Sequence, residues 1–321
     1  MSETRPDPFP FLVGSGRSGT TMLRLMVDAH PAMTIPPESF FPMKPSPAWI
    51  DAAGDLDAVA AARALGAEPW FADWKLPVGS FESSVRADPP AGYAELVRRL
   101  FRLYADGEGK PRYGSKTPQH VLSISELAAL FPESRFVHIV RDGRDVALSF
   151  LDVHFGPSDL LFAARLWKRR VRQGRIAGRA LGGERYLEVR YEELVAFPER
   201  ELRRLCGFAC LEFDDAMLRY HERDQSTIAG VAGHYFHRNA ARPPTKGLRD
   251  WRSQMSHSDV LLFESVAGTT LEEFGYERSN QPVSRMDRVR VDVRRAIALT
   301  RSRLRGLRRV PVAATRRLRR A

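Results

Sequence analysis

Two things are scarce in this 321-residue sequence, cysteine and long apolar runs, and each shortage excludes a class of protein. No apolar run approaches the roughly 20 residues that a membrane-crossing helix needs. The two cysteines, Cys206 and Cys210, make a poor zinc site by themselves, and we expect them to fill a small apolar cluster. The first residues also lack the apolar core of a signal peptide, which favours a cytoplasmic location.

The positive charge of the chain is concentrated at its end. The sequence has 50 Lys and Arg against 39 Asp and Glu, a net charge of +11. Residues 281–321 alone hold fourteen Arg, no Lys and two Asp, so the first 280 residues are close to neutral. The length allows a substantial core, and we predict one domain over residues 1–280 followed by a basic tail over 281–321.

The tail has the pattern of an amphipathic helix, because one set of residues recurs at steps of three and four. The members of this set are Met286, Val289, Val293, Ile297, Thr300, Leu304 and Leu307. Arginines fill most other positions until about residues 306–311. Such a helix is compatible with a solvated helix laid on the body, with an anionic membrane surface, and with nucleic acid or an acidic partner. No aromatic residue interleaves the arginines, which disfavours a mode in which single-stranded nucleic acid stacks its bases on the helix.

The strongest chemical signal is a glycine-rich turn at residues 11–21, which read Phe-Leu-Val-Gly-Ser-Gly-Arg-Ser-Gly-Thr-Thr. An apolar run predicts a strand before the turn, and a helical stretch follows it. Glycines allow the backbone to approach a ligand closely, so that successive N–H groups converge on an anion at the helix start. We predict a phosphate site made by Gly14, Ser15, Gly16, Arg17, Ser18, Gly19, Thr20 and Thr21.

This loop lacks one residue of a Walker A motif. The lysine that reaches the β- and γ-phosphates of ATP is replaced by Thr20, which argues for a phosphate ligand other than a hydrolysed nucleoside triphosphate. An ATP-dependent phosphotransferase stays open as an alternative, and Asp142 is then its one candidate Mg²⁺ ligand. A non-catalytic protein that acts through its basic tail on a membrane or on nucleic acid is the second alternative.

A second segment, residues 136–150, also runs from an apolar strand into a polar turn and a helix. Its Arg141 offers a planar fork of donors that suits a phosphate. Ser149 lies about two helical turns further on. The mid-strand His138 is expected to be a core residue.

Together the two segments resemble the sulfotransferases that use 3′-phosphoadenosine 5′-phosphosulfate (PAPS), and the Arg-Ser-Gly-Thr-Thr form is most similar to the tyrosylprotein and carbohydrate branches. The resemblance covers about residues 8–280. It implies that the glycine-rich loop binds the 5′-phosphosulfate and that Arg141 and Ser149 bind the 3′-phosphate. It also implies that Tyr191 packs on the adenine and that a late loop covers the 3′-phosphate. That loop contains Lys246 and Gly247.

The resemblance further implies a reaction, the transfer of a sulfuryl group from PAPS to an acceptor hydroxyl. The product of the donor is 3′-phosphoadenosine 5′-phosphate (PAP), and no metal is expected. Glu38 matches the general base of the tyrosylprotein branch, while Arg17 and Lys116 match groups beside the transferred sulfuryl. Because cytosolic members use histidine as the base, His120 and His154 stay open as alternatives.

Alternating strands and helices predict an α/β fold, which the resemblance specifies as a P-loop-like three-layer fold with a central parallel sheet and helices on both faces. The predicted strands cover residues 9–13, 33–35, 136–140 and 185–189, and one of the predicted helices covers residues 214–223. Residues 42–90 break this rhythm and are predicted to be an acceptor-side insertion, whose tryptophans either select the acceptor or pack a helical cap on the core. We expect the acceptor to be a sugar, a lipid or a small alcohol.

Overall fold

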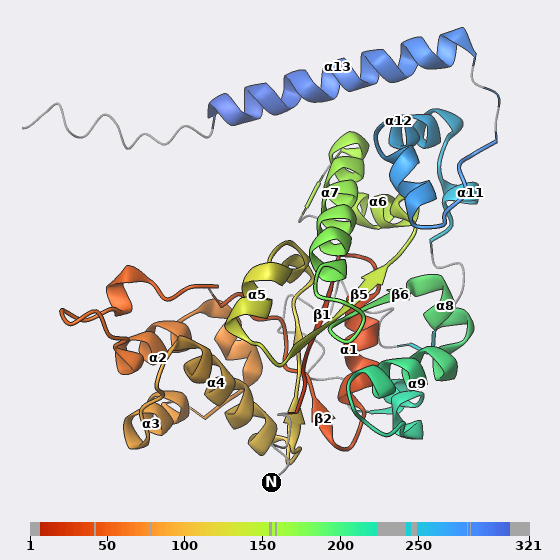
Figure 1. Ribbon diagram of the computed structural model, residues 1–321. Coiled ribbons are helices and arrows are strands. Elements are labelled where there is room, and N and C mark those ends of the chain that lie inside the picture. The colour runs from red at the N-terminus through yellow and green to blue at the C-terminus, as the bar shows by residue number, and fades with distance from the viewer. Residues whose placement is uncertain are drawn as a thin grey trace, which may run out of the picture. The chain divides into compact units, whose positions relative to one another are not determined.

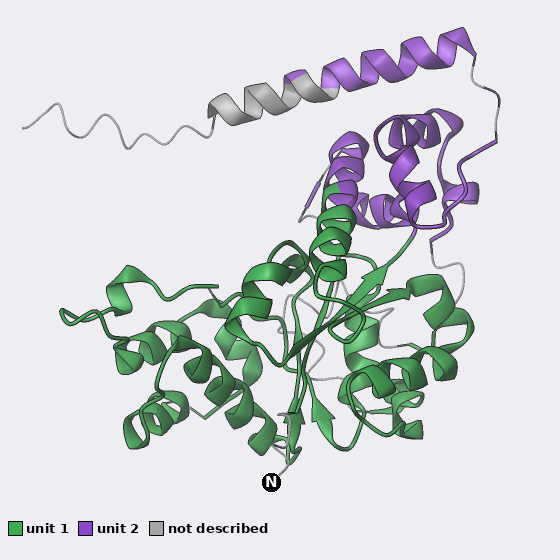
Figure 2. Cartoon of the chain, in the orientation of Figure 1, with its two compact units in different colours: residues 1–141, 169–248 green, residues 142–168, 249–321 purple. Residues whose placement is uncertain are grey.

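The computed structural model describes residues 7–41, 43–77, 79–153, 156–157, 159–223, 242–244, 249–280, 282 and 284–308. The chain divides into two compact units (Figure 2). Unit 1 contains residues 1–141 and 169–248, and unit 2 contains residues 142–168 and 249–321. The chain therefore passes from unit 1 to unit 2 between Arg141 and Asp142, inside the second of the two predicted phosphate segments.

A four-stranded parallel sheet forms the centre of unit 1 (Figure 1). Its strands lie in the order β4 (Ser115–Lys116), β1 (Phe9–Gly14), β5 (Ser134–Val140) and β6 (Tyr186–Arg190). A separate parallel pair is made by β2 (Met33–Thr34) and β3 (Arg112–Tyr113). Strand β1 is buried over its whole length, as expected for an apolar run at the centre of a parallel sheet. The two-residue strands β3 and β4 are too short to show a period, and sequence analysis missed them.

Apolar residues on both faces of this sheet pack against helices. Phe11 and Phe136 belong to one core, with α4 (Tyr93–Gly107), α5 (Ile124–Leu130) and the 3₁₀ helix η3 (Pro118–Leu122). Leu12, Val137 and Ile139 belong to the other, with α1 (Thr20–Asp28), α8 (Tyr191–Ala196) and α9 (Pro198–Phe208). Successive strand residues point to opposite faces, so each strand contributes to both cores. The predicted three-layer α/β fold is confirmed.

Helix α7 (Leu160–Arg179) approaches the sheet closely through two glycines. A Cβ at Gly174 would lie 2.9 Å from the His138 ring, and one at Gly178 would overlap the Tyr186 ring. His138 is fully buried and lies 2.7 Å from the Tyr186 hydroxyl. The predicted role of His138 as a core histidine is confirmed.

The described part of residues 42–90, the predicted insertion, is mostly helical. They contain α2 (Ala58–Gly66), α3 (Ser80–Ala87) and the 3₁₀ helices η1 (Pro47–Trp49) and η2 (Pro69–Trp74). Trp70 and Trp74 are buried in the same core as α4, and the Trp74 ring lies 5.0 Å from that of Phe101. Of the two roles considered for the tryptophans, Trp70 and Trp74 therefore have the structural one.

Two further expectations were wrong in part. The helix expected at residues 214–223 is instead a pair of 3₁₀ turns, η4 (Asp215–Met217) and η5 (Tyr220–Glu222), because Asp214 caps a turn whose i→i+3 bonds do not continue as a helix. Cys206 is buried in an apolar cluster beside Met217, as predicted. Cys210, by contrast, is exposed in a left-handed turn after α9.

Unit 2 is helical. It contains α6 (Gly143–Leu151), the first part of α7, α11 (Trp251–Gln254), α12 (His257–Glu273) and α13 (Arg285–Arg308). Helix α13 agrees with the predicted amphipathic helix of the tail. None of the helices in the described residues combines the length and the apolar character that crossing a membrane requires.

Candidate active site

Four of the residues singled out from the sequence lie at the carboxyl ends of the four strands of the central sheet, one at each strand. Gly14 ends β1, Lys116 ends β4, Arg141 follows β5 and Tyr191 follows β6. All four strands are parallel, so their carboxyl ends lie at one edge of the sheet (Figure 1). Open α/β sheets bind ligands outside this edge, which makes it the candidate active site.

The glycine-rich loop has the conformation that its sequence predicts. A Cβ on Gly14 would lie 2.6 Å from the Ile139 carbonyl oxygen, so only glycine fits there. Arg17 and Gly19 are left-handed, with φ of 72° and 92°, and α1 begins after Gly19 without a side-chain cap. The buried hydroxyls of Ser15 and Ser18 have no hydrogen-bond partner among the described residues. An uncapped helix start with unsatisfied hydroxyls fits a bound anion.

Tyr191 packs directly against this loop, and Arg141 packs on the Tyr191 ring. The Tyr191 ring covers Gly19, where an added Cβ would lie 2.7 Å from its Cε2 atom. The Arg141 guanidinium lies 4.4 Å from the centre of the same ring, in cation–π geometry. Arg141 is buried, so the loop, the ring and the cation form one rigid wall of the site.

Glu38 and Lys116 meet beside the loop although 78 residues separate them in the sequence. The Lys116 Nζ atom donates to Glu38 Oε1 at 2.6 Å and lies 3.5 Å from Thr21 Oγ1. The Lys116 side chain is only 3 % exposed, whereas that of Glu38 is 29 % exposed. Burial lowers the pKa of Lys116, and the neighbouring Glu38 carboxylate opposes that shift. A buried ammonium and an accessible carboxylate thus lie side by side next to an anion site.

Two residues that the sequence analysis missed hold Glu38 in place. The Thr117 hydroxyl donates to the Ser39 carbonyl at 2.8 Å and accepts from the Ser39 N–H at 3.2 Å. Three residues before Glu38 in the chain, the Ile35 carbonyl accepts a hydrogen bond from Nε of the buried Arg24 at 2.8 Å. An arginine inside the apolar run of α1 was the signal that could have indicated such a role, since a buried guanidinium requires acceptors.

The other predicted site residues are only partly placed. Ser149 is buried in α6 of unit 2, whereas Arg141 ends unit 1, so their joint contact with a 3′-phosphate stays a prediction. Lys246, Gly247 and the alternative base His154 lie outside the described residues. His120 is buried on η3 beside the rings of Phe11 and Phe41. Burial lowers the pKa of His120 to about 4, so its ring is neutral at pH 7.

The two buried histidines predict a loss of stability in mild acid. Burial lowers the pKa of both His120 and His138 to about 4, against about 6.5 in an unfolded chain. Below pH 6.5 these histidines are therefore protonated in the unfolded state but stay neutral in the folded state until the pH approaches 4. Between pH 7 and 5 we expect the free energy of unfolding to fall by on the order of 1–2 kcal/mol for each histidine. Urea titrations of wild type and His120→Gln measure this, and an equal loss in both proteins would contradict it.

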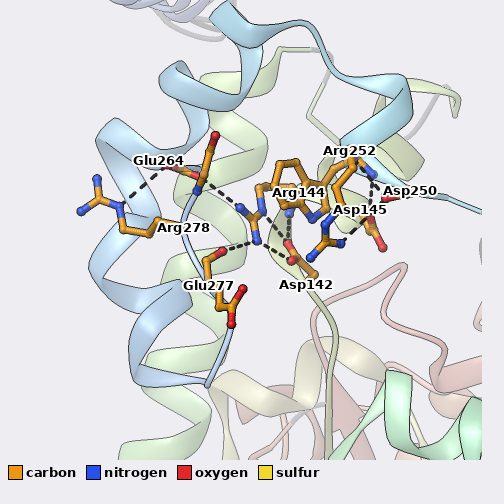
Figure 3. Close-up of polar contacts among 10 residues, drawn as sticks. Asp142, Arg144, Asp145, Asp250, Arg252, Glu264, Glu277 and Arg278 are labelled. Atoms are coloured by element: carbon orange, nitrogen blue, oxygen red, sulfur yellow. Dashed lines mark hydrogen bonds and ion pairs between the residues drawn. The ribbon is translucent and has the colours of Figure 1, made fainter. Parts of the chain in front are cut away.

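Asp142 is not available as a magnesium ligand. Its Oδ1 atom accepts from Arg144 Nε at 3.0 Å and its Oδ2 atom accepts from Arg144 Nη2 at 2.7 Å (Figure 3). Over the part of the chain that the structure describes, no group of three or more His, Cys, Asp or Glu is arranged to hold a metal ion. The alternative of an ATP-dependent phosphotransferase is therefore disfavoured, because Asp142 was its one candidate Mg²⁺ ligand.

Comparison with known proteins agrees with this geometry. The model of the sulfotransferase family matches residues 8–215. The chain is 26 % identical to protein-tyrosine sulfotransferase A of Caenorhabditis elegans, over 87 % of this chain and 70 % of that protein. It is 26 % identical to human protein-tyrosine sulfotransferase 1, over 86 % and 71 %. The fold is similar to the sulfotransferase domain of the Synechococcus PCC 7002 olefin synthase, with a TM-score of 0.59, 24 % identity, and coverage of 88 % of this chain and 98 % of that domain.

Proposed function

Because the chain belongs to the sulfotransferase family, we propose that it transfers a sulfuryl group from PAPS to an acceptor hydroxyl and leaves PAP as the product. The observation that carries this proposal is the Lys116–Glu38 pair beside the glycine-rich loop and the uncapped start of α1. A base next to a cation and an anion site is the arrangement that sulfuryl transfer requires, since a proton leaves the acceptor while negative charge develops on the donor.

In this proposal, different residues bind different parts of the donor. The loop from Gly14 to Thr21 holds the 5′-phosphosulfate, with Ser15 and Ser18 as additional donors. Arg141 binds the 3′-phosphate, which Ser149 and the loop of Lys246 and Gly247 complete. Tyr191 presents its ring to the adenine. The described geometry supports the loop and Arg141 most directly, because both are packed against Tyr191.

The chemical step follows from the same residues. Glu38 accepts the hydroxyl proton of the acceptor as the acceptor oxygen forms a bond to sulfur. The bond between sulfur and the bridging oxygen of the donor breaks, and its electron pair stays on the phosphate of PAP. Lys116, Arg17 and the N–H groups of the loop stabilise that charge. Losing one preorganised donor of this kind typically costs ~3–4 kcal/mol of transition-state stabilisation.

The described residues do not select one chemical class of acceptor. We propose a hydroxyl of a sugar, a lipid or a small alcohol, and the names of the two relatives add protein tyrosine as a further class. We also propose that the enzyme acts in the cytoplasm. Incubation with sulfur-labelled PAPS and one representative of each class, followed by identification of the labelled product, tests the acceptor directly.

Nucleotide binding gives the first test of the proposal. We expect PAP to bind roughly 10- to 100-fold more tightly than 5′-AMP, because hydrogen bonds from a charged group to a phosphate are worth about 1.5–3 kcal/mol. Arg141→Ala should remove most of this preference, as measured by calorimetry. Arg98→Ala is the matched control, since Arg98 pairs with Glu133 away from the loop. Equal affinities for PAP and 5′-AMP in the wild type would refute the assignment of the nucleotide.

The same titration separates the two enzyme classes. A phosphotransferase should bind ATP with Mg²⁺ more tightly than PAP, whereas a sulfotransferase should prefer PAP with or without the metal. Tighter binding of the magnesium–ATP complex would restore the alternative that the Asp142–Arg144 contact disfavours.

A further inference from the structure

One side of helix α13 contacts α12. Val291 is 7 % exposed, and Arg294 Nη2 lies 2.7 Å from Asp259 Oδ1 of α12. Asp287, on the same side of α13, lies 3.7 Å from His257 Nε2 at the start of α12. These contacts fix the orientation of the helix within unit 2 and so decide which side of it is accessible.

The accessible side of α13 carries a row of large apolar side chains, which we call the α13 stripe. Its members are Met286, Val289, Val293 and Ile297, and they are 65 %, 60 %, 51 % and 46 % exposed. At 3.6 residues per turn these four positions share one face, and Val291 points roughly 160° away from its centre. The stripe therefore does not pack on α12, and a contiguous exposed apolar row of this kind is typical of an interaction site.

Arginines line the α13 stripe. By helical position Arg290 flanks one side of the row and Arg285 flanks the other, whereas Arg294 is paired with Asp259 of α12. The wider segment 281–321 holds fourteen Arg against two Asp, with Leu304 and Leu307 continuing the sequence pattern of the stripe. An apolar face with a cationic border matches a surface that is apolar inside and anionic at its boundary. An acidic polypeptide would satisfy the arginines but would leave most of the stripe without an apolar partner.

We propose that α13 docks unit 2 on an anionic lipid bilayer, with the α13 stripe entering the boundary between headgroups and acyl chains and the flanking arginines contacting phosphate and carboxylate headgroups. This goes beyond the proposed reaction and does not depend on it. Every group assigned to the transfer reaction lies outside α13. The proposed role of this helix is therefore attachment and not catalysis.

Vesicle sedimentation of the full-length protein tests this docking. Phosphatidylcholine vesicles containing about 30 % phosphatidylserine should bind the protein at least tenfold more tightly than pure phosphatidylcholine. Binding should weaken as salt rises, because screening shortens the reach of surface charge. The double variant Val289→Asn and Val293→Asn removes two apolar side chains without changing charge, and we expect it to bind at least fivefold more weakly.

A matched control removes exposed apolar side chains elsewhere. Ile176 and Phe197 are 67 % and 52 % exposed and lie outside α13, so replacing both by Asn should leave vesicle binding unchanged. Equal binding of the stripe variant and the wild type would overturn the proposal, as would equal binding to neutral and anionic vesicles. If the wild type did not bind anionic vesicles but bound polyglutamate, the partner of α13 would be an acidic protein instead. The salt series on the wild type decides the matter even if a variant fails to fold.

Discussion

Replacing Glu38 by glutamine is expected to lower turnover by a factor on the order of 10²–10⁴, the usual span for the loss of a general base. The amide has the shape of the carboxylate but cannot accept the proton of the acceptor. The affinity for PAP should stay nearly unchanged, because the loop and Arg141 make their contacts without Glu38. Initial rates with labelled PAPS and calorimetry with PAP measure the two quantities separately.

Two further variants make the Glu38 result specific. Glu126→Gln makes the same chemical change at an exposed position on α5, and its turnover should equal that of the wild type. Thr117→Val removes the hydroxyl that holds Ser39, so we expect an intermediate loss of turnover with little change in PAP affinity. If Glu38→Gln kept near wild-type turnover, the base would have to be His120, His154 or a group not identified so far.

Replacing Arg144 by methionine is expected to lower the free energy of unfolding by about 3–5 kcal/mol, the usual cost of removing one partner from a buried ion pair. The Arg144 side chain is 1 % exposed and contacts carboxylates of Asp142 and Glu264 that are 9 % and 5 % exposed (Figure 3). It also donates to the Glu277 carbonyl at 2.8 Å and lies 3.6 Å from the centre of the Trp251 ring. Methionine fills part of the space but removes the cation that the two buried carboxylates share, while Glu264 keeps a longer contact to Arg278 at 3.8 Å.

Chemical denaturation followed by circular dichroism measures this loss. Arg294→Met removes a second ion pair of unit 2, but Arg294 is 40 % exposed, so its cost should stay below about 1 kcal/mol. Arg144→Lys keeps the charge and loses the planar fork, and it should fall between the two. A change of less than about 1 kcal/mol for Arg144→Met would show that Asp142 and Glu264 find other partners or take up protons.

The sequence predicted those parts of the molecule in which neighbouring residues carry the whole signal. Strand β1 and most of β5 are apolar runs, and β6 alternates buried Tyr186 and Val189 with partly exposed residues. Each of these three predicted strands agrees with the structure to within about two residues. The glycine-rich loop was recognisable because its glycines are needed locally: Gly14 lies against the Ile139 carbonyl, and Gly19 is left-handed. The helical period of the tail likewise predicted α13.

Other features depended on contacts between residues far apart in sequence. The helices α2 and α3 were missed because Pro, Gly and Asp dominate their surroundings, whereas their stability comes from burying Leu65, Phe81 and Val85 in the core that also contains α4. The expected helix at residues 214–223 was wrong because helix propensity is weak compared with the capping and packing that set the turns there. The exposure of Cys210 follows from the left-handed turn that ends α9.

The candidate site shows the same division. By itself the sequence predicted the glycine-rich loop and the edge of the sheet that is the candidate active site, because a strand, a glycine turn and a helix start are consecutive in the chain. Only the tertiary structure decided that Lys116 meets Glu38 at 2.6 Å, that Thr117 and Arg24 hold the Glu38 segment, and which face of α13 stays exposed. Those outcomes require parallel strands and packed helices to bring distant residues together, and no local pattern encodes that proximity.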